Sequence, residues 1–357
     1  MGLRAAGLTT RKPLLVAACF VAVATIVLVA ILMTRSHRQG LFSDESPWNS
    51  ALGADAHIDP SSRRRVDALA TRIEAAQRNG LWPAVTFGAY SVPVYVVGDD
   101  APSVPVRLDT GPWGKALARA LASGVPIPSV ARPAPGTDGH LVIWEPSTDR
   151  LWEFWQAVRR RDGWHASWGG AMRQVSASPG YYSDRSWPGL RSNEGWNWGA
   201  TATSLPVIAG LGTLEELRRG RIDHALAASV PEACAGVFAF PAQRTDGQDG
   251  RSDCMPAGAR LRLDPRLDLR RLRLSPIARV LARAAQRYGI IVRDTTHGSF
   301  AFYTQIAPGG GEGLYTGSRT VWGGAPSWKA LDGFPWRRLQ LMASRLCRAA
   351  PCRPPNG

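Results

Sequence analysis

Residues 140–155 read HLVIWEPSTDRLWEFW. Apolar residues dominate both halves of this stretch, and Pro146 to Asp149 between them has the composition of a tight turn. We therefore predict a β-hairpin whose register is set by pairing across a four-residue loop. The predicted pairs are Glu145 with Arg150, Trp144 with Leu151, Ile143 with Trp152, Val142 with Glu153, Leu141 with Phe154 and His140 with Trp155.

This register sorts the hairpin side chains into two faces. The first face, a core face, carries Leu141, Ile143, Trp152 and Phe154. The second face carries His140, Val142, Trp144, Leu151, Glu153 and Trp155. Because indole rings pack on the apolar face of a pyranose while ionisable groups reach the linkage, the second face is a candidate sugar-binding groove. The alternative is that both faces are core and that His140 is a buried structural histidine.

The N-terminal part of the chain predicts a membrane anchor. Leu14 to Met33 has no ionisable group except the Cys19 thiol and is long enough to cross a bilayer. No small-x-small cleavage site follows it, which favours an uncleaved signal-anchor with the N-terminus inside the cell. The expected organisation is a cytoplasmic tip at 1–13, a transmembrane segment at 14–33, a tether at 34–60 and a single extracytoplasmic β-rich domain at 61–357.

The remaining cysteines predict disulfides. Short intervening loops favour the pairs Cys234 with Cys254 and Cys347 with Cys352, which suit an oxidising exterior. A zinc site is the alternative, but there is no CxxC pair or histidine cluster to support it. We expect no metal and no cofactor.

The charge balance suggests a class of partner. The chain has 43 Lys and Arg against 28 Asp and Glu, a formal net charge of +15. A basic domain outside the cell favours acidic glycans or cell-wall polyanions. Lysine occurs only at Lys12, Lys115 and Lys329, so the arginine excess of a GC-rich genome is an alternative explanation. Because the basic residues are scattered, nucleic acid is not an expected partner.

The rest of the sequence alternates short apolar strands with capped helices. Helices are predicted at 63–78, 115–121, 277–288 and 336–348, with a short one after the capping box that starts at Thr213. Strands are predicted at 86–97, 104–108, 221–230, 237–242 and 260–263, and a second hairpin joins 290–293 to 300–306. This pattern predicts a mainly β fold with peripheral helices, an antiparallel, jelly-roll-like β-sandwich.

Tryptophan is concentrated in the middle of the chain. Half of the 14 tryptophans fall between Trp152 and Trp198. Trp196 and Trp198 lie in a loop rich in Gly, Ser, Asn and Asp, where with Trp144 and Trp155 they could form a sugar-binding lip. The alternative is that these rings fill the core.

No GxSxG, HExxH, P-loop or GxGxxG signature is present. His224, in Ile222-Asp223-His224, and Tyr303-Thr304-Gln305 resemble the jelly-roll polysaccharide lyases of the alginate-lyase type, which have a histidine on an inner strand and a Tyr-x-Gln near the C-terminal strand. The chain departs from that pattern at Ile222, where the family has glutamine, and lacks the lysine that precedes the Tyr-x-Gln. The strings PWN, DGH, WEFW and IDHAL also look like an uncharacterised family of exported bacterial proteins.

The resemblance implies β-elimination beside a uronate carboxyl group. Arg244 or Gln305 would neutralise the carboxylate, His224 or His140 would take the C5 proton, and Tyr303 would donate to the leaving oxygen. His224 also shares a face with apolar neighbours, so a core histidine is the alternative.

Two other functions stay open. Hydrolysis would need two carboxylates in one cleft, with Glu153 and either Asp223 or Asp246 as candidates. A non-enzymatic, membrane-anchored cell-wall or glycan-binding module would use the same tryptophans without proton-transfer groups. In each case the expected partner is a polysaccharide or cell-wall glycan.

Overall fold

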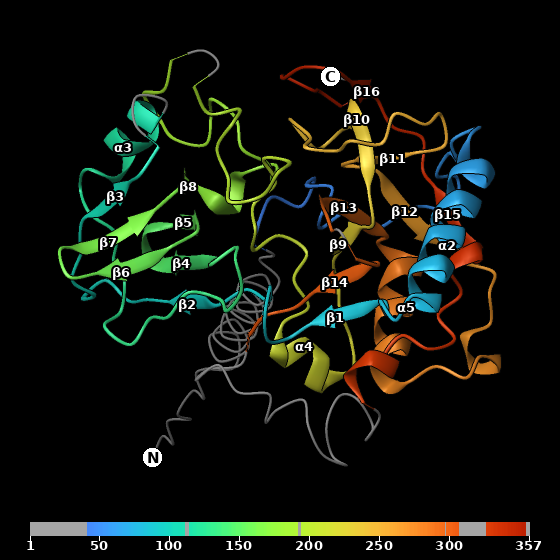
Figure 1. Ribbon diagram of the computed structural model, residues 1–357. Helices are drawn as coiled ribbons and strands as arrows, with labels where there is room; N and C mark the ends of the chain where they lie inside the picture. The colour runs from blue at the N-terminus through green and yellow to red at the C-terminus, as the bar shows by residue number, and fades with distance from the viewer. Residues whose placement is uncertain (1–40, 111–113, 192–193, 297, 307–325, 355–357) are drawn as a thin grey trace, which may run out of the picture. The chain divides into compact units, whose positions relative to one another are not determined.

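Four β-sheets and a few helices make up the part of the chain that the computed structural model describes, residues 41–110, 114–191, 194–296, 298–306 and 326–354 (Figure 1). These residues belong to one structural unit that begins at Leu41. The prediction of a mainly β fold is therefore confirmed. The predicted membrane anchor at 14–33 lies outside the described residues, within which no helix has the length and apolar character to cross a bilayer.

The 140–155 hairpin forms in the predicted register. Strands β4 (Leu141–Glu145) and β5 (Arg150–Trp155) pair antiparallel, from Glu145 with Arg150 to Leu141 with Phe154. Asp149 takes the left-handed conformation that closes the turn, with φ of 53°. Strands β2 (Val94–Val96) and β8 (Trp168–Arg173) complete this sheet in the order β2-β4-β5-β8.

The middle of the second face is buried like the core face, so the predicted groove does not run along the hairpin, although Trp155 at its open end stays 36% exposed. Val142, Leu151 and Glu153 are fully buried there. The reason is a later segment that covers this face: the backbone N–H groups of Ala200 and Val207 donate to the Glu153 carboxylate, each at 2.8 Å. The hydrophobic core around this hairpin also includes residues of a second small sheet and of helix α3 (Lys115–Leu121). The strands of this sheet are β3 (Val106–Leu108), β7 (Gly163–Ala166) and β6 (Val158–Arg160).

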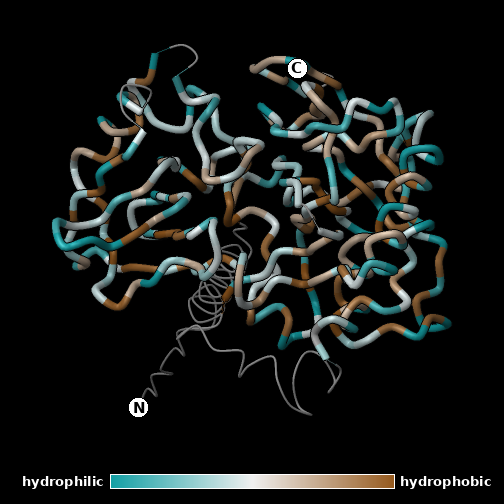
Figure 2. The backbone as a smooth tube through the Cα atoms, viewed as in Figure 1, coloured by the Kyte–Doolittle hydropathy of each residue, from teal (hydrophilic) through white to brown (hydrophobic). Residues whose placement is uncertain are grey.

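A six-stranded mixed sheet organises the other core. Its order is β1 (Ala84–Thr86), β14 (Ala301–Tyr303), β9 (Leu226–Val230), β13 (Ile290–Thr295), β12 (Arg260–Leu263) and β15 (Leu339–Leu341). Helices α2 (Ser62–Arg78) and α5 (Pro276–Arg287) pack their apolar sides into this core. Figure 2 shows hydrophobic stretches along the strands of both cores.

The remaining elements lie at the margins of the six-stranded sheet. Strands β10 (Ala233–Ala239), β11 (Met255–Ala257) and β16 (Leu346–Cys347) form a three-stranded sheet. Both predicted disulfides, Cys234–Cys254 and Cys347–Cys352, are present. Helix α4 (Leu214–Arg219) begins at the predicted capping box and ends at Gly220, whose φ is 71°.

Three predictions about topology are wrong. Strands β13 and β14 do not pair with each other, because the fully buried strand β9 lies between them, parallel to β13 and antiparallel to β14. Residues 336–348 are not a helix: a short 3-10 turn at Trp336–Arg338 leads into β15 and β16, which pair with β12 and β10. The sheets are not purely antiparallel, since β1 with β14, β9 with β13, β2 with β4, β3 with β7 and β10 with β11 are parallel pairs.

Candidate functional site

A pocket of about 1310 Å³ opens where several strands end. One wall comes from the six-stranded sheet, with Thr86, Ser229, Asp294 and Tyr303 at or next to the carboxyl ends of β1, β9, β13 and β14. The facing wall comes from the hairpin sheet, with Asp138 and His140 just before β4, Trp155 at the end of β5 and Trp168 at the start of β8. Residues 199–202 and the segment that holds Arg244 and Asp246 complete the lining.

The pocket contains three aspartates, Asp138, Asp246 and Asp294. Asp294 is enclosed by protein on most sides, yet part of its side chain remains accessible from the pocket. Burial raises the pKa of Asp294 to about 7, the negative charge of Asp246 adds to this rise, and the Arg293 guanidinium opposes it. The protonated form of Asp294 is therefore populated near neutral pH, unlike that of an ordinary aspartate.

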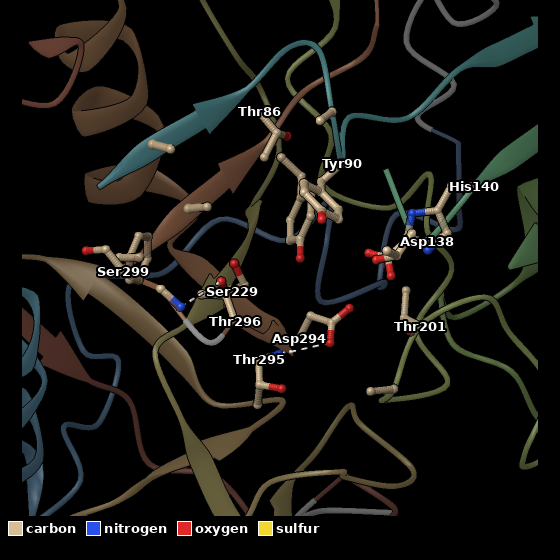
Figure 3. Close-up of a pocket in the computed structure, with 18 of the residues that line it drawn as sticks. Thr86, Tyr90, Asp138, His140, Thr201, Ser229, Asp294, Thr295, Thr296 and Ser299 are labelled. Atoms are coloured by element: carbon tan, nitrogen blue, oxygen red, sulfur yellow. Dashed lines mark hydrogen bonds between the residues drawn. The ribbon is translucent and has the colours of Figure 1, made fainter. Parts of the chain in front are cut away.

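Asp138 reaches the same space from the facing wall. Figure 3 shows the carboxyl groups of Asp138 and Asp294 entering the cavity from different elements. The indole N–H of Trp155 donates to Asp138 at 3.5 Å. The loop before Asp138 requires Gly136, whose φ is 100° and where a Cβ would lie 3.0 Å from the Tyr90 ring.

One arginine, Arg293, is buried behind the pocket, and another, Arg244, lies in its lining. Arg293 is fully buried and lies 4.0 Å from the centroid of the Tyr303 ring, while its Nη1 donates to the carbonyl oxygens of Val207 and Ala209. Burial raises the pKa of the Tyr303 hydroxyl above its ordinary value, so it stays protonated. Arg244 lines the pocket, and its Nη2 donates to the carbonyl oxygen of Thr201 at 2.6 Å.

His140 is a buried, neutral histidine at the pocket wall. Its Nε2 lies 3.0 Å from the carbonyl oxygen of Ala200, which requires the proton to be on Nε2. Burial lowers the pKa of His140 to about 4, although the negative charge of Asp138 opposes this. His140 is therefore uncharged at neutral pH.

Protonation of His140 is expected to destabilise the fold in acid. Since its folded-state pKa lies below its ordinary value of 6.5, its contribution to stability is present above pH 6.5 and is lost as the pH falls through about 4. The variant His140→Gln keeps a donor for the Ala200 carbonyl oxygen but has no group that titrates here. Between pH 6.5 and about 4, its free energy of unfolding should fall by about 1 kcal/mol or more less than that of the wild type. Urea unfolding across that range measures the difference. An unchanged pH dependence in the variant would show that His140 is not the group responsible.

Aromatic rings and unpartnered polar atoms share the lining. Trp155 and Trp168 are cross-strand neighbours of β5 and β8, and Trp155 is 36% exposed. Trp82, Tyr90 and Trp328 are more exposed still. Among the described residues, four buried polar atoms of the lining have no hydrogen-bond partner. They are Thr110 Oγ1, His140 Nδ1, Arg244 Nε and Ser299 Oγ.

The pocket brings together five of the residues selected from the sequence: His140, Trp155, Arg244, Asp246 and Tyr303. The others do not line it. Glu153 and Trp198 are core residues, Trp144 packs partly buried against that core, and Trp196 donates from its indole to Asp184. His224 lies 3.2 Å from Glu216, and Gln305 accepts from the Leu214 backbone N–H.

Sequence reasoning missed Asp138, Asp294, Trp168, Thr201 and Ser229. Asp294 carried a signal, since it directly follows the strand predicted at 290–293, and the ends of strands often hold functional groups. Asp138 stands in a Gly-rich turn just ahead of the hairpin, the same kind of position. Within the described ranges no cluster of three or more His, Cys, Asp or Glu side chains is arranged to hold a metal ion.

Fold and site together define a mainly β protein with an acidic, aromatic-lined pocket. No protein-family model, no curated protein and no solved structure matches this chain. The chemistry of the pocket is therefore the basis for a function.

Proposed function

We propose that this protein hydrolyses glycosidic bonds of a polysaccharide. The observation that carries the proposal is the placement of Asp294, with a pKa near 7, and Asp138 in one aromatic-lined pocket. Glycoside hydrolysis needs a carboxylic acid that still holds its proton near neutral pH and a second carboxylate on the other side of the sugar ring. These two residues offer that combination.

In the proposed reaction, Asp294 donates its proton to the glycosidic oxygen as the bond to the anomeric carbon breaks. Asp138, from the facing wall, either deprotonates the attacking water or attacks the anomeric carbon itself. Asp246 helps to keep the proton on Asp294, because its own negative charge raises the Asp294 pKa. The Arg293 guanidinium packs over the Tyr303 ring, and the Tyr303 hydroxyl at the pocket wall can donate a hydrogen bond to the substrate.

The rest of the lining suits a sugar. Trp155 and Trp168 present neighbouring rings on which pyranose faces can pack. The polar side chains of Thr110, Ser299, His140 and Arg244 lie among these rings, so the lining combines apolar faces with hydrogen-bonding groups, as a sugar requires.

Elimination has weaker support from the same pocket. A lyase needs a base for the C5 proton, and the histidine at the pocket wall has a pKa of about 4, which makes it a poor base at neutral pH. Two residues that the lyase resemblance implied, His224 and Gln305, do not line the pocket. Lyase activity and a jelly-roll-like stacking of the sheets remain predictions from the sequence.

We also propose that the domain acts outside the cytoplasm, tethered by the 14–33 segment. Two disulfides support an oxidising compartment. The glycan would then belong to the cell wall or to the surroundings of the cell.

Trp155→Ala should weaken glycan binding. Loss of the exposed ring removes a packing surface and the indole donor to Asp138, so KM should rise about tenfold, the effect of ~1.4 kcal/mol. Steady-state kinetics measure this change, with Trp144→Ala as a control that removes an indole from the same hairpin outside the pocket. An equal rise in KM for both variants would contradict a direct role for Trp155.

The proposed function is tested by incubating the full chain with a panel of neutral, amino and acidic polysaccharides. Reducing ends and the ultraviolet absorbance of unsaturated products are read together. New ends without absorbance support hydrolysis, and new absorbance shows elimination instead. Retardation in a polysaccharide gel without cleavage would identify a glycan-binding module.

A further inference from the structure

One aspartate of the pocket has no direct part in bond cleavage. Asp294 and Asp138 are assigned to the reaction, whereas Asp246 acts on it only through its charge, which raises the Asp294 pKa. Asp246 is exposed at the pocket wall, and its carboxylate oxygens lie 3.4 and 3.5 Å from the Thr295 hydroxyl. That long contact with a neutral hydroxyl does not balance its charge.

Within the described part of the chain, the three pocket aspartates lack a direct ion pair, although the charge of the buried Arg293 guanidinium acts on Asp294. Asp249, by comparison, pairs with Arg72 and Arg251, each at 2.9 Å. Among the described residues, Asp138, Asp246 and Asp294 form no ion pair within 4.0 Å. Carboxylates that are partly removed from water and left unpaired cost free energy, which a bound cation recovers.

The one arginine of the described lining is already engaged. Arg244 donates through Nη2 to the carbonyl oxygens of Gly199 at 3.3 Å and Thr201 at 2.6 Å. Three aspartates of the described residues therefore line the pocket together with one arginine, whose Nη2 is turned toward backbone oxygens, while Arg293 is buried beneath the lining. The carboxylates of the pocket would repel an acidic sugar at short range. The net charge of +15 on the whole chain attracts anions only at longer range, where salt screens it.

Two further features of the lining indicate a ligand. Ser299 and His140 are 6% and 2% exposed, and Ser299 Oγ and His140 Nδ1 have no partner among the described residues. The exposed rings of Trp155 and Tyr90 lie in the same pocket. Aromatic faces beside carboxylates form a favourable environment for an ammonium group.

We propose that the pocket takes a glycan with free amino groups and that the Asp246 carboxylate binds the ammonium of one amino sugar. This inference rests on the proposed hydrolase function and names its substrate class. N-acetylation would remove the positive charge and leave a single neutral N–H donor for Asp246, and uronates would bring a charge of the wrong sign.

The test compares oligomers of glucosamine and galactosamine with the same oligomers after N-acetylation, using the full chain in slightly acidic buffer. Polygalacturonate serves as the acidic arm. We expect the amino forms to be cleaved with a kcat/KM about tenfold or more above the acetylated forms, the size of one charge-assisted hydrogen bond. Asp246→Asn should abolish this ratio, whereas the matched control Asp100→Asn, an exposed aspartate outside the pocket, should preserve it.

A second readout separates recognition from general damage. Because Asp246 repels charge on Asp294, its replacement should also move the alkaline limb of the pH–rate profile to lower pH for both forms of substrate. Equal or faster cleavage of the acetylated forms would overturn the inference and leave the hydrolase proposal standing. Cleavage of polygalacturonate alone would overturn it as well. If no oligomer is cleaved or retained, both proposals fail.

Discussion

Asp294→Asn is expected to reduce glycan cleavage by about 10²- to 10⁴-fold, the usual contribution of a general acid. Asparagine keeps the size of the side chain and the acceptor for the Thr295 backbone N–H, but it has no proton to give to the glycosidic oxygen. Reducing-end assays measure the loss, and Asp100→Asn is the matched control. If the variant keeps full activity, Asp294 is not the acid.

The wild-type pH profile gives an independent check of the same residue. Only the protonated form of Asp294 can donate, so the rate should decline as the pH rises through about 7. The same mutation should lower activity but raise the stability of the fold at neutral pH. Since the folded-state pKa lies above the ordinary value of 3.8, ionisation of Asp294 reduces stability as the pH rises through about 7, and asparagine removes that loss. We therefore expect the Asp294→Asn variant to be as stable as the wild type, or more so, and to have lost most of its cleavage activity.

Glu153→Ala should have the largest effect on folding. The Glu153 carboxylate accepts from the backbone N–H groups of Ala200 and Val207 at 2.8 Å, and burial raises its pKa to about 7. Truncation leaves both buried donors without an acceptor, at about 1–3 kcal/mol each, and adds a cavity. The expected loss is therefore about 3 kcal/mol or more, a large part of the total stability of a typical domain.

Urea unfolding of Glu153→Ala and Glu153→Gln tests this structural role. Glutamine restores one acceptor, so its cost should lie between alanine and wild type. Glu45→Ala, at an exposed position, is the control. A fully stable Glu153→Ala with impaired cleavage would show that Glu153 acts in catalysis after all.

The local structure of this chain could be predicted where short-range chemistry decides it. The hairpin register follows from one turn and the alternation around it, and the capping box at Thr213 and the pair Ser275-Pro276 define helix starts without help from distant residues. The two disulfides follow from short loops. In each case the determining residues are close in sequence.

The pairing of strands that are far apart in the chain could not be predicted from the sequence in this way. Strand β9 is fully buried between β13 and β14, and this arrangement depends on partners 64 to 74 residues away in the sequence. Residues 336–348 had the composition of a helix, yet pairing with β12 and β10 overrode that propensity.

The candidate site shows the same limit. His140, Trp155 and Tyr303 were found because aromatic and ionisable residues on strands stood out. Glu153 was misassigned because nothing local shows that residues 198–207 cover its face. Asp138 and Asp294 were missed because a single aspartate at a strand end is common, and only the fold places the two in one pocket.

The central claim, addition of water across a glycosidic bond, is tested most directly by digesting a cleaved member of the polysaccharide panel in water that carries heavy oxygen. Mass spectrometry then reports the composition of each product end. We predict saturated products whose new reducing ends carry one solvent oxygen, and no such products from Asp294→Asn. Unsaturated products without solvent oxygen would contradict the account and establish elimination in its place.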